Sequence, residues 1–299
     1  MKKIVIGTRG SRLALYQAEL VRSSLREVAP EQEVEVRIIK TKGDKFLQLA
    51  LDASGDKGLF TRELEQELLS GGIDLAVHSL KDLPVELVSG TSIGAILPRE
   101  ATADALLGAY TLETLPQGAI VGTSSRRRVE QLRLHRPDLQ FRPIRGNVET
   151  RIAKMKSGQY DAIVMAVAGL RRLGLEGEIS QVIDERVVVP APGQAAIAVH
   201  QRADRTDLTE LLQLIHCSRT AREVTLERNI LSRLGGGCAL PLGAVCHIDG
   251  AKHHVRTFYA SADGSQHLKQ TLSFDEGEAD QQLERVIQEL KQLNAPYHG

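Results

Sequence analysis

From residue 73 onward the chain reads Ile-Asp-Leu-Ala-Val-His-Ser-Leu-Lys-Asp-Leu-Pro, ending at Pro84. A short apolar run that passes abruptly into polar residues is typical of a buried strand leaving a parallel sheet. Ligands of open α/β sheets gather outside the carboxyl ends of strands, so Lys81 and Asp82 are candidates for chemistry. Pro84 prevents the segment from continuing as a ladder strand. The alternative is that Lys81 and Asp82 form a solvated pair in a turn.

Size and charge limit the classes of protein to which the chain can belong. It has 299 residues, of which 42% are hydrophobic, enough for two or three packed domains. Lys plus Arg and Asp plus Glu number 38 each, so the chain lacks the basic excess of a typical nucleic-acid-binding protein. With 3% aromatic residues and no Trp, it offers few surfaces for stacking single-stranded bases. We therefore expect no nucleic-acid partner.

Cysteine content and hydropathy indicate the compartment. Cys217, Cys238 and Cys246 are too few and too scattered for a disulfide framework or a zinc site. We expect a reducing compartment and no metal. The sequence has no apolar run of the roughly 18 residues that indicate a membrane-spanning helix, and its first residues follow a strand pattern rather than that of a signal peptide. We therefore expect a cytoplasmic protein with no membrane partner.

The first predicted strand and helix are joined by a turn that suits an anion. Hydrophobic periodicity predicts a strand at residues 3–7 and a helix at residues 11–28. The turn therefore lies at a helix N-terminus, where unpaired amides and the helix dipole attract negative charge. Arg9 adds a positive charge and Ser11 a hydroxyl group. The alternative for Ser11 is that its side chain only caps the helix.

A second turn, in residues 119–128, repeats the first. It reads Ala-Ile-Val-Gly-Thr-Ser-Ser-Arg-Arg-Arg, and its Gly-Thr and hydroxyl residues again lie between a predicted strand and helix. We interpret the repeat as two similar domains that each offer an anion-binding helix N-terminus to a shared cleft. Three arginines in a first helical turn oppose the helix dipole, so we expect an anion at residues 126–128. The alternative is a solvated helix face.

Arginine also follows two further predicted strands. Arg145 follows the strand predicted at residues 140–144, and Arg151 lies in the next helix. Arg172 comes shortly after the apolar strand predicted at residues 161–168. The planar guanidinium group of arginine binds a carboxylate or a phosphate through two parallel hydrogen bonds. We therefore expect a ligand that carries several acidic groups.

Two proline-marked crossings divide the chain into three predicted domains. The crossings lie at residues 98–104 and 189–199, so the chain leaves the first domain and later returns to it. After residue 242, strand patterns separated by Asp-Gly turns and a final amphipathic helix predict a small α+β domain. We predict an α/β domain at residues 1–97 with 195–217, a second α/β domain at 98–194, and a third, α+β domain at 218–299.

Two predicted loops have the composition of functional elements. Residues 41–57 lack a sustained period and predict a long loop, of the kind that often forms a lid. Cys238 directly follows three glycines, which leave the backbone free to approach a ligand and provide little packing around the sulfur. We interpret Cys238 as an accessible thiol. The alternative is a small buried hydrophobe, which also suits Cys217 and Cys246.

Seven short motifs, in order between residue 4 and about residue 245, together resemble the porphobilinogen deaminase (hydroxymethylbilane synthase) family. They are Gly7-Thr-Arg-x-Ser11, Thr41-x-Gly-Asp44, Lys57-Gly-Leu-Phe60, Val77-His-Ser-Leu-Lys-Asp-Leu-Pro84, Gly122-Thr-Ser-Ser-x-Arg-Arg128, Arg145-Gly-Asn147 and Gly236-Gly-Cys238. The resemblance implies an α/β fold with two similar periplasmic-binding-protein-like domains around a cleft and a small C-terminal α+β domain. It also implies a transferase that deaminates four porphobilinogen molecules and joins them head to tail into hydroxymethylbilane, in porphyrin and haem biosynthesis.

The resemblance also implies roles for single residues. A dipyrromethane cofactor, bound to Cys238 through a thioether, primes the reaction, and Asp82 is the catalytic residue. The implied cofactor-binding residues are Lys81, Thr123, Ser124, Ser125, Arg127, Arg128, Arg145 and Gly146. The implied substrate-binding residues are Arg9, Ser11, Gln17, Asn147, Arg151 and Arg172. Lys57 and Phe60 are implied to belong to a lid.

The chemistry of the implied reaction agrees with the residue types. Each pyrrole carries an acetate and a propionate, so the growing chain is a polyanion that arginines can bind. Loss of ammonia leaves an azafulvenium cation, which an anionic carboxylate stabilises electrostatically. We expect the surrounding arginines to keep Asp82 ionised. The alternative to an enzyme is a non-catalytic polyanion-binding module built on the same cleft.

We expect the protein to be a monomer whose partner is the small-molecule substrate porphobilinogen.

Four positions depart from the pattern of the family. Asp56 and Ala195 stand where the family usually has glycine, His200 stands where it commonly has glutamate, and Gly235 stands where an acidic residue often precedes Gly-Gly-Cys. None of these departures removes a chemical group that carries an implied role. We expect them to affect the lid, through Asp56, and the second interdomain crossing, through Ala195.

Overall fold

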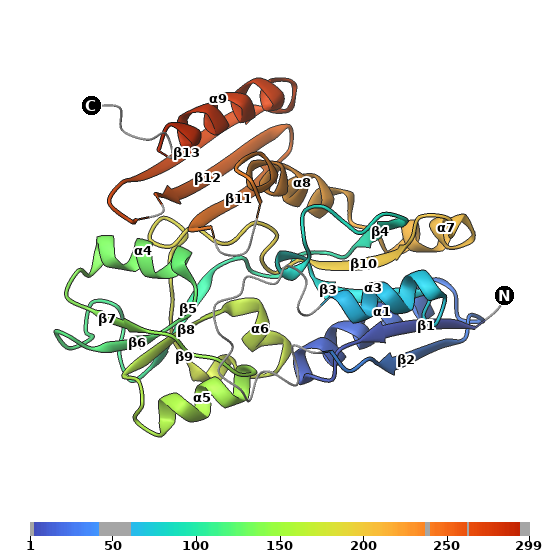
Figure 1. The fold of residues 1–299 in the computed structure, drawn as a ribbon, viewed down its shortest axis with the longest axis horizontal. Coiled ribbons are helices and arrows are strands. Elements are labelled where there is room, and N and C mark those ends of the chain that lie inside the picture. The colour runs from blue at the N-terminus through green and yellow to red at the C-terminus, as the bar shows by residue number, and fades with distance from the viewer. Residues whose placement is uncertain (1–2, 42–60, 237–239, 262, 294–299) are drawn as a thin grey trace. The chain divides into compact units, whose positions relative to one another are not determined.

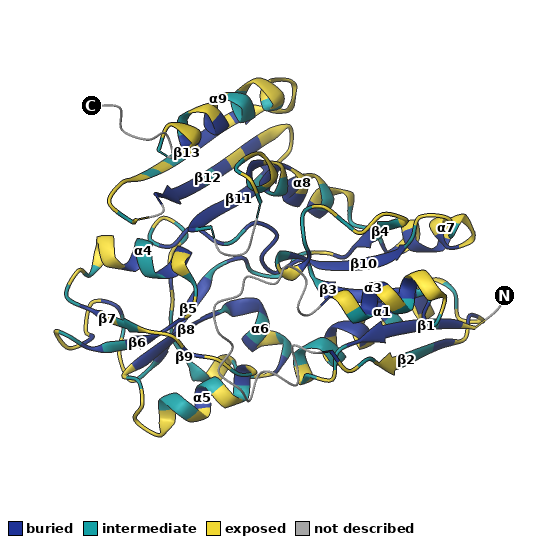
Figure 2. Cartoon of the chain, in the orientation of Figure 1, coloured by how far each residue is buried: buried dark blue, intermediate teal, exposed yellow. Residues whose placement is uncertain are grey.

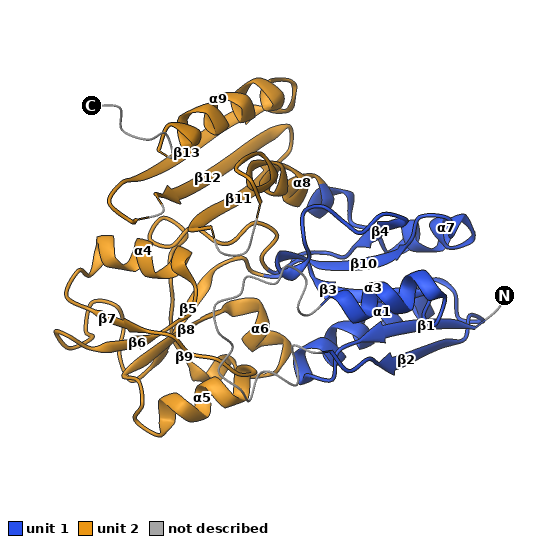
Figure 3. Ribbon diagram, viewed as in Figure 1, with its two compact units in different colours: residues 1–100, 195–221 blue, residues 101–194, 222–299 orange. Residues whose placement is uncertain are grey.

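The computed structural model describes residues 3–41, 61–236, 240–261 and 263–293 (Figure 1). The chain divides into two compact units, which are coloured separately in Figure 3. The first unit comprises residues 1–100 and 195–221, and the second comprises residues 101–194 and 222–299. The chain therefore enters the second unit, returns to the first and enters the second again, as the two crossings in the sequence predict.

A five-stranded sheet forms the centre of the first unit, in the order β2-β1-β3-β10-β4. Its strands are β1 (Ile4–Thr8), β2 (Val34–Ile38), β3 (Leu75–Ser79), β4 (Thr91–Ile96) and β10 (Ile197–Arg202). β1 runs parallel to β2 and β3, whereas β10 runs antiparallel to β3 and β4. The carboxyl ends of β1 and β3 therefore lie at the same edge of the sheet.

Helices cover both faces of this sheet. One hydrophobic core joins the sheet to α1 (Arg12–Val28) and α7 (Thr206–Ile215), and a second joins the opposite face to α3 (Arg62–Ser70). Successive strand residues point to opposite faces, so in β3 Leu75 packs in the first core and Ala76 in the second. Burial on both faces explains why β1 and β3 read as nearly continuous apolar runs (Figure 2).

A second five-stranded sheet, in the order β7-β6-β8-β5-β9, lies in the second unit. Its strands are β5 (Asp104–Gly108), β6 (Ile120–Gly122), β7 (Gln140–Arg142), β8 (Ala162–Ala166) and β9 (Ile179–Val182), and its helices are α4 (Arg126–His135), α5 (Val148–Lys156), α6 (Val167–Arg172) and the short η2 (Glu176–Glu178). β6 is parallel to β7 and β8, and β5 is antiparallel to β8 and β9. Strand order and directions match those of the first sheet, so the chain contains two similar α/β sheets.

The third sheet has three antiparallel strands and also belongs to the second unit. It contains β11 (Leu242–Asp249), β12 (Lys252–Ala260) and β13 (His267–Asp275), followed by η3 (Glu276–Glu278) and α9 (Ala279–Gln292). One face packs on α9 and on α8 (Ser218–Arg233) in a single hydrophobic core. From the other face, Val245, Phe258 and Ala260 contact Val189. This sheet and its two helices form the predicted C-terminal α+β arrangement.

Two strands of the second sheet do not follow from the sequence pattern. Residues 98–104 predict an irregular crossing, but β5 already begins at Asp104. β9 is a four-residue edge strand whose side chains are only partly buried, so it lacks a hydrophobic period. Most other predicted strands of the two α/β sheets are confirmed within one or two residues, among them β1 and β3. The predicted domain boundaries stay a prediction, since the second unit contains both the second and the third predicted domain.

Candidate active site

The carboxyl ends of β1 and β3 bring the first group of predicted site residues to one sheet edge. Ile6 pairs with Leu75 and Gly7 with Ala76, so the segments that follow Thr8 and Ser79 leave the sheet side by side. Gly7 permits this packing, because a Cβ atom there would lie 2.3 Å from Cδ1 of Ile73. The edge therefore carries Arg9 and Ser11 from the first segment and Lys81 and Asp82 from the second.

Ser11 caps helix α1. The backbone N–H of Ala14 donates a hydrogen bond to Ser11 Oγ at 3.3 Å, and the hydroxyl of Thr8 donates to the carbonyl of Ala14 at 3.1 Å. The N-cap reading of Ser11 is thus confirmed. Because a hydroxyl group that accepts one hydrogen bond can also donate another, its predicted role in substrate binding stays open as a prediction.

Gln17 is buried and fixes the end of β3. Its side-chain amide donates to Ser79 Oγ at 2.8 Å, and Ser79 Oγ lies 3.2 Å from Gln17 Oε1. Ser79 is the residue that precedes η1 (Leu80–Asp82), the short helix that contains Lys81 and Asp82. In the described structure, Gln17 therefore contacts the segment that carries the predicted catalytic residue.

The η1 turn is hydrogen-bonded to the residue that directly precedes strand β10. The N–H of Leu80 donates to the carbonyl of Ala196 at 3.0 Å, and the N–H of Leu83 donates to the carbonyl of Leu80 at 3.1 Å. Leu80 and Leu83 are buried, Lys81 is half-buried and Asp82 is exposed. The buried leucines anchor the turn, so the carboxylate of Asp82 stands on a fixed backbone and faces solvent.

Two buried histidines lie next to this edge. His78 and His200 project from neighbouring strands, with 5.6 Å between their ring centroids. Burial, with smaller contributions from the nearby His200 and Arg9, lowers the pKa of His78 to about 3. Burial lowers the pKa of His200 to about 4. Both rings are therefore neutral at pH 7, and the charges at this edge come from Arg9, Lys81 and Asp82.

The second group of predicted site residues follows β6 in the second unit. Ser124 Oγ donates to the carbonyl of Ile144 at 2.8 Å, and the N–H of Ile144 donates to Ser124 Oγ at 3.1 Å. The N–H of Ser125 donates to Thr123 Oγ1 at 3.2 Å. These bonds tie the turn after β6 to the segment after β7, which continues into Arg145. The structure thus brings these two predicted parts of the site together.

Arg127 and Arg128 are both buried and share the carboxylate of Asp104. Arg127 Nη2 lies 2.8 Å from Asp104 Oδ2, and Arg128 Nη2 lies 2.6 Å from Asp104 Oδ1. Backbone carbonyl groups accept a further hydrogen bond from each guanidinium group, at 2.7 Å from Val189 and 2.9 Å from Val164. Burial lowers the pKa of Arg127, which the neighbouring Asp104 carboxylate opposes.

This arrangement corrects one reading of the arginine cluster. A solvated helix face is wrong for Arg127 and Arg128, whose side chains are 5% and 9% exposed, although Arg126 is exposed. The anion expected near these arginines includes a carboxylate of the chain itself, Asp104. Sequence reasoning missed Asp104, and the available signal was a lone charged residue at the start of an apolar strand. That Arg127 and Arg128 bind a cofactor stays a prediction.

The N-terminus of α5 carries the third group. Arg145 and Asn147 are exposed, and Arg151 Nε donates to the carbonyl of Gly146 at 2.7 Å. Gly146 has a φ of +119°, and a Cβ atom there would lie 2.7 Å from Thr150, so the turn requires glycine. Lys154, which sequence reasoning missed, donates to the carbonyl of Arg145 at 3.1 Å.

Several predicted residues lie elsewhere or outside the described residues. Arg172 is half-buried at the end of α6. Cys246 is buried in β11 and Cys217 is half-buried, as expected of structural cysteines. Lys57, Phe60 and Cys238 lie outside the described residues, as does Asp56. Within the described ranges, no group of three His, Cys, Asp or Glu residues is arranged to hold a metal ion, and no helix has the length and apolar character needed to cross a membrane.

Comparisons with known proteins cover nearly the whole chain. The family model described as porphobilinogen deaminase, dipyromethane cofactor binding domain, matches residues 4–210, and the model of the porphobilinogen deaminase C-terminal domain matches residues 221–292. The chain is 49% identical to porphobilinogen deaminase of Syntrophomonas wolfei over 268 residues, which is 89% of this chain and 88% of that one. It is 46% identical to porphobilinogen deaminase of Desulfitobacterium hafniense over 292 residues, or 97% and 94% of the two chains.

Solved structures of binding proteins also align with the chain. The methionine-binding protein MetQ is 10% identical, with a TM-score of 0.45 over 76% of this chain and 94% of that one.

Proposed function

Because the chain belongs to the porphobilinogen deaminase family, we propose that Asp82 is its catalytic carboxylate and Cys238 the attachment site of its cofactor. The protein is a transferase that deaminates four porphobilinogen molecules and joins them head to tail into hydroxymethylbilane, in porphyrin biosynthesis. Its cofactor is dipyrromethane. The non-catalytic polyanion-binding reading receives no support from these relatives. The proposal concerns which residues carry the reaction.

The observation that carries the assignment of Asp82 is its place on η1. The turn is anchored by buried leucines, by the hydrogen bond from Leu80 to Ala196, and by the bond between Gln17 and Ser79 that precedes it. A carboxylate on a fixed backbone pays little reorganisation energy when a positive charge develops beside it. This arrangement supports a charge-stabilising role for Asp82.

In each coupling step the amino group of porphobilinogen leaves as ammonia after it has gained a proton. The exocyclic methylene carbon then carries part of a positive charge, which the carboxylate of Asp82 stabilises. The free α-carbon of the acceptor pyrrole forms a new carbon–carbon bond with this methylene carbon and loses a proton. At the same sheet edge, Lys81 would hold a carboxylate of the cofactor and Arg9 one of the substrate. Release of the tetrapyrrole would require the first unit added to lose its bond to the primer, whose α-carbon regains a proton, while water adds to the methylene carbon of that unit and loses a proton.

The described residues fit a cofactor that carries acetate and propionate groups. Bound through a thioether to Cys238, dipyrromethane supplies the free pyrrole α-position that accepts the first substrate. The exposed Arg145 and the backbone of the glycine turn beside it offer charge-assisted and backbone donors for carboxylates. Arg128 also fits, because its buried Nε atom has no hydrogen-bond partner among the described residues, and such groups usually have one.

We assign the remaining predicted residues by the same reasoning. Thr123, Ser124 and Ser125 would orient cofactor carboxylates. Ser11, Asn147, Arg151 and Arg172 would bind those of the substrate, and Gln17 would act by fixing the position of Ser79. Lys57 and Phe60 are proposed lid residues. The proposed domains are 1–97 with 195–217, 98–194 and 218–299.

We also propose that the protein is a cytoplasmic monomer that binds neither nucleic acid nor membrane. A reducing compartment is supported by the cysteine content, because three scattered cysteines are too few for a disulfide framework. A formal net charge of zero gives no support to nucleic-acid binding. Sedimentation velocity of the purified protein tests the monomer, and a second, concentration-dependent boundary would contradict it.

The experiment that tests the cofactor assignment is a mass measurement on the purified protein. We expect the intact mass to exceed the sequence mass by two linked pyrrole units, and the tryptic peptide with Cys238 to carry the addition. Peptides with Cys217 and Cys246 should be unmodified, and the Cys238→Ser variant should carry no adduct. An unmodified Cys238 in active protein would remove the primer from the mechanism and contradict the assignment.

A further inference from the structure

Two carboxylates of α8 bind the backbone of strand β11. Glu223 Oε1 accepts a hydrogen bond from the N–H of Ile248 at 3.0 Å, and Glu227 Oε1 accepts one from the N–H of Cys246 at 2.8 Å. β11 is an edge strand of the three-stranded sheet, so alternate N–H groups point away from β12. The two glutamates are buried one helical turn apart, and they satisfy these N–H groups in place of a fourth strand.

Glu227 also binds the crossing segment, which links the two units in the sequence. Its second oxygen, Oε2, accepts a hydrogen bond from the N–H of Gly193 at 2.7 Å. Gly193 lies in the crossing segment that follows Val189 and Pro190, far from α8 in the sequence. The side chain of Glu227 is fully buried, and such a carboxylate is tolerated only where hydrogen bonds replace its lost hydration. Glu227 therefore joins α8, β11 and the crossing segment at one point.

The crossing segment continues this contact to the buried arginines. Gln194, the residue after Gly193, donates its side-chain amide to the carbonyl of Thr102 at 2.6 Å and to Asp104 Oδ1 at 3.0 Å. Asp104 is the carboxylate shared by Arg127 and Arg128. Hydrogen bonds, joined by the peptide bond between Gly193 and Gln194, thus connect the backbone of β11 through Glu227 to the predicted cofactor-binding arginines.

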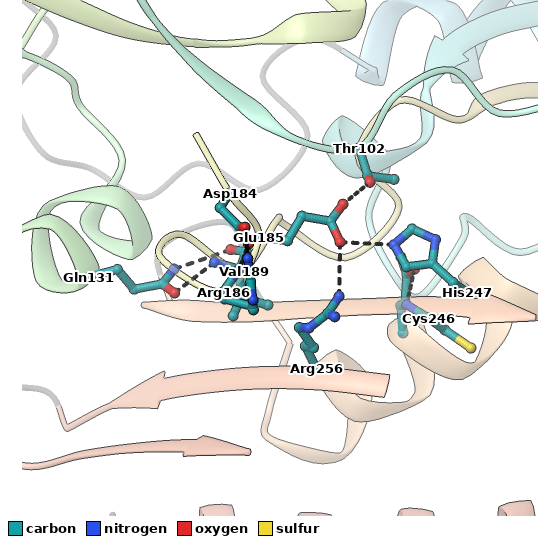
Figure 4. A network of polar contacts seen from close by, with 10 residues as sticks. Thr102, Gln131, Asp184, Glu185, Arg186, Val189, Cys246, His247 and Arg256 are labelled. Carbon is teal, nitrogen blue, oxygen red and sulfur yellow. Dashed lines mark hydrogen bonds and ion pairs between the residues drawn. The ribbon is translucent and has the colours of Figure 1, made fainter. Parts of the chain in front are cut away.

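A separate set of contacts holds the three-stranded sheet in the second unit. Glu185 Oε2 lies 2.9 Å from His247 Nε2 and 3.3 Å from Arg256 Nη1, and its other oxygen accepts a hydrogen bond from Thr102 (Figure 4). The N–H of Ala244 donates to the carbonyl of Pro190 at 2.9 Å. These contacts do not involve Glu227. A change at Glu227 therefore leaves the sheet attached, so its effect on activity can be measured in folded protein.

Helix α8 ends five residues before Cys238 in the sequence. After Arg233, the N–H of Gly235 donates to the carbonyl of Ser232 at 3.0 Å, and that of Gly236 donates to the carbonyl of Leu231 at 3.0 Å. These bonds close the last turn of the helix, so the position of Gly236 follows that of α8. Cys238 comes two residues later in the sequence.

We propose that Glu227 is a positioning residue, which fixes the end of α8 relative to the Asp104, Arg127 and Arg128 cluster. Cys238, the proposed attachment point of the cofactor, follows this helix end in the sequence, and Arg127 and Arg128 are the proposed binders of the cofactor's carboxylates. The inference rests on the proposed roles of Cys238 and of these arginines. Glu223 fastens the same helix to the same strand through the N–H of Ile248, and so it provides a control for the attachment of α8 to β11.

The test compares Glu227→Gln with Glu223→Gln. Each glutamine keeps the size of the side chain, but at Glu227 its NH2 group must face one of two backbone donors, so one contact is lost. We expect Glu227→Gln to lower kcat by about tenfold to a hundredfold with little change in KM, as small displacements of reacting groups do. We also expect a smaller fraction of its molecules to carry the cofactor by intact mass. Glu223→Gln should keep wild-type loading and a kcat within about twofold.

Melting temperature separates positioning from stability. Equal loading and kcat in the two variants, at comparable melting temperatures, would overturn the inference while leaving the proposed function intact. An unmodified Cys238 in active wild-type protein would instead overturn the proposed function. Should Glu227→Gln fail to fold, Glu227→Asp replaces it, because it keeps the charge and shortens the reach by one methylene group. Wild-type loading and turnover in Glu227→Asp would then contradict the inference.

Discussion

Asp104 changes the meaning of the two arginines that follow Ser125. Three arginines in a first helical turn indicate an anion, and this inference from the helix dipole was correct in kind. The structure identifies one such anion as a residue about twenty positions earlier in the chain. Removal of one partner from this buried ion pair would lower stability, because it leaves a buried charge without compensation.

Arg127 and Arg145 should therefore respond differently to replacement by alanine. We expect Arg127→Ala to lower the free energy of unfolding by about 3 kcal/mol, since the carboxylate of Asp104 loses a buried partner. Arg145 is exposed, so Arg145→Ala should change the free energy of unfolding by less than about 0.5 kcal/mol while lowering turnover. Urea denaturation and steady-state rates on both variants check this expectation. Equal losses of stability in the two would contradict it.

Ala195 stands in a backbone conformation that suits glycine. Its φ is +72°, in the left-handed region, where the Cβ atom of an L-residue clashes with the backbone. We expect Ala195→Gly to raise the free energy of unfolding by about 0.5–1 kcal/mol, because relief of strain exceeds the added entropy of the unfolded chain. The neighbouring Ala196 has no positive φ, so Ala196→Gly should lower stability. A lower urea midpoint for Ala195→Gly would contradict the strain argument.

At the residue scale, the sequence indicates which residues carry chemistry but not which distant residues they contact. Lys81 and Asp82 were identified because a strand pattern ends just before them, and local patterns are visible in a sequence. The partner of Gln17 is 62 residues away in the chain and that of Arg128 is 24 residues away, so neither follows from spacing. The strain at Ala195 was also not predicted, although its departure from the family pattern was the available signal.

At the scale of elements, the parallel pairing of β1 and β3 determines which residues can act together. β3 was predicted because it is buried on both faces and so reads as an apolar run. β5 was missed because it is only five residues long and begins at the last residue of a proline-marked segment. The repeated turn sequence after β1 and β6 correctly predicted two similar sheets, because in both sheets a similar turn joins a strand to a helix.

The histidine pair between β3 and β10 predicts acid sensitivity. An unfolded histidine titrates near 6.5, whereas burial lowers the pKa of His78 to about 3 and that of His200 to about 4. Between pH 4 and 6.5 the unfolded chain therefore binds more protons than the folded chain, and stability falls as pH falls. Each histidine contributes up to about 1.4 kcal/mol per pH unit.

Urea denaturation at pH 5 and pH 7 measures this effect. The His200→Leu variant removes one titrating group, so its stability should depend less steeply on pH than that of the wild type. His135→Gln, at an exposed position, should keep the wild-type slope. The same slope in His200→Leu and in the wild type would show that the pair does not control acid stability.

At the scale of the whole molecule, the chain contains two like α/β sheets and a third, antiparallel sheet. The second unit holds the α/β sheet with the buried arginines together with the antiparallel sheet. Gly243 illustrates their close packing, because a Cβ atom there would lie 2.7 Å from the carbonyl oxygen of Val189. Sequence patterns predicted the antiparallel sheet as a separate domain but not this contact, because it joins residues that have no local signal in common.

The central claim is that Asp82 acts in the chemical step rather than in folding or binding. Only interactions that are stronger in the transition state accelerate a reaction, so a neutral isostere should keep the fold and the substrate affinity. Asp82→Glu keeps the charge but moves it by one methylene group, and it should retain a small activity and accumulate partly elongated chains that intact mass detects.

The most direct measurement is the turnover of Asp82→Asn per cofactor-loaded molecule, with loading taken from intact mass. Loss of a preorganised electrostatic contact lowers a rate by about a hundredfold to a thousandfold. We predict a loss of at least this order, with a melting temperature and a porphobilinogen affinity close to those of the wild type. Near-normal turnover of Asp82→Asn would contradict the assignment and return Lys81 and Asp82 to a solvated turn.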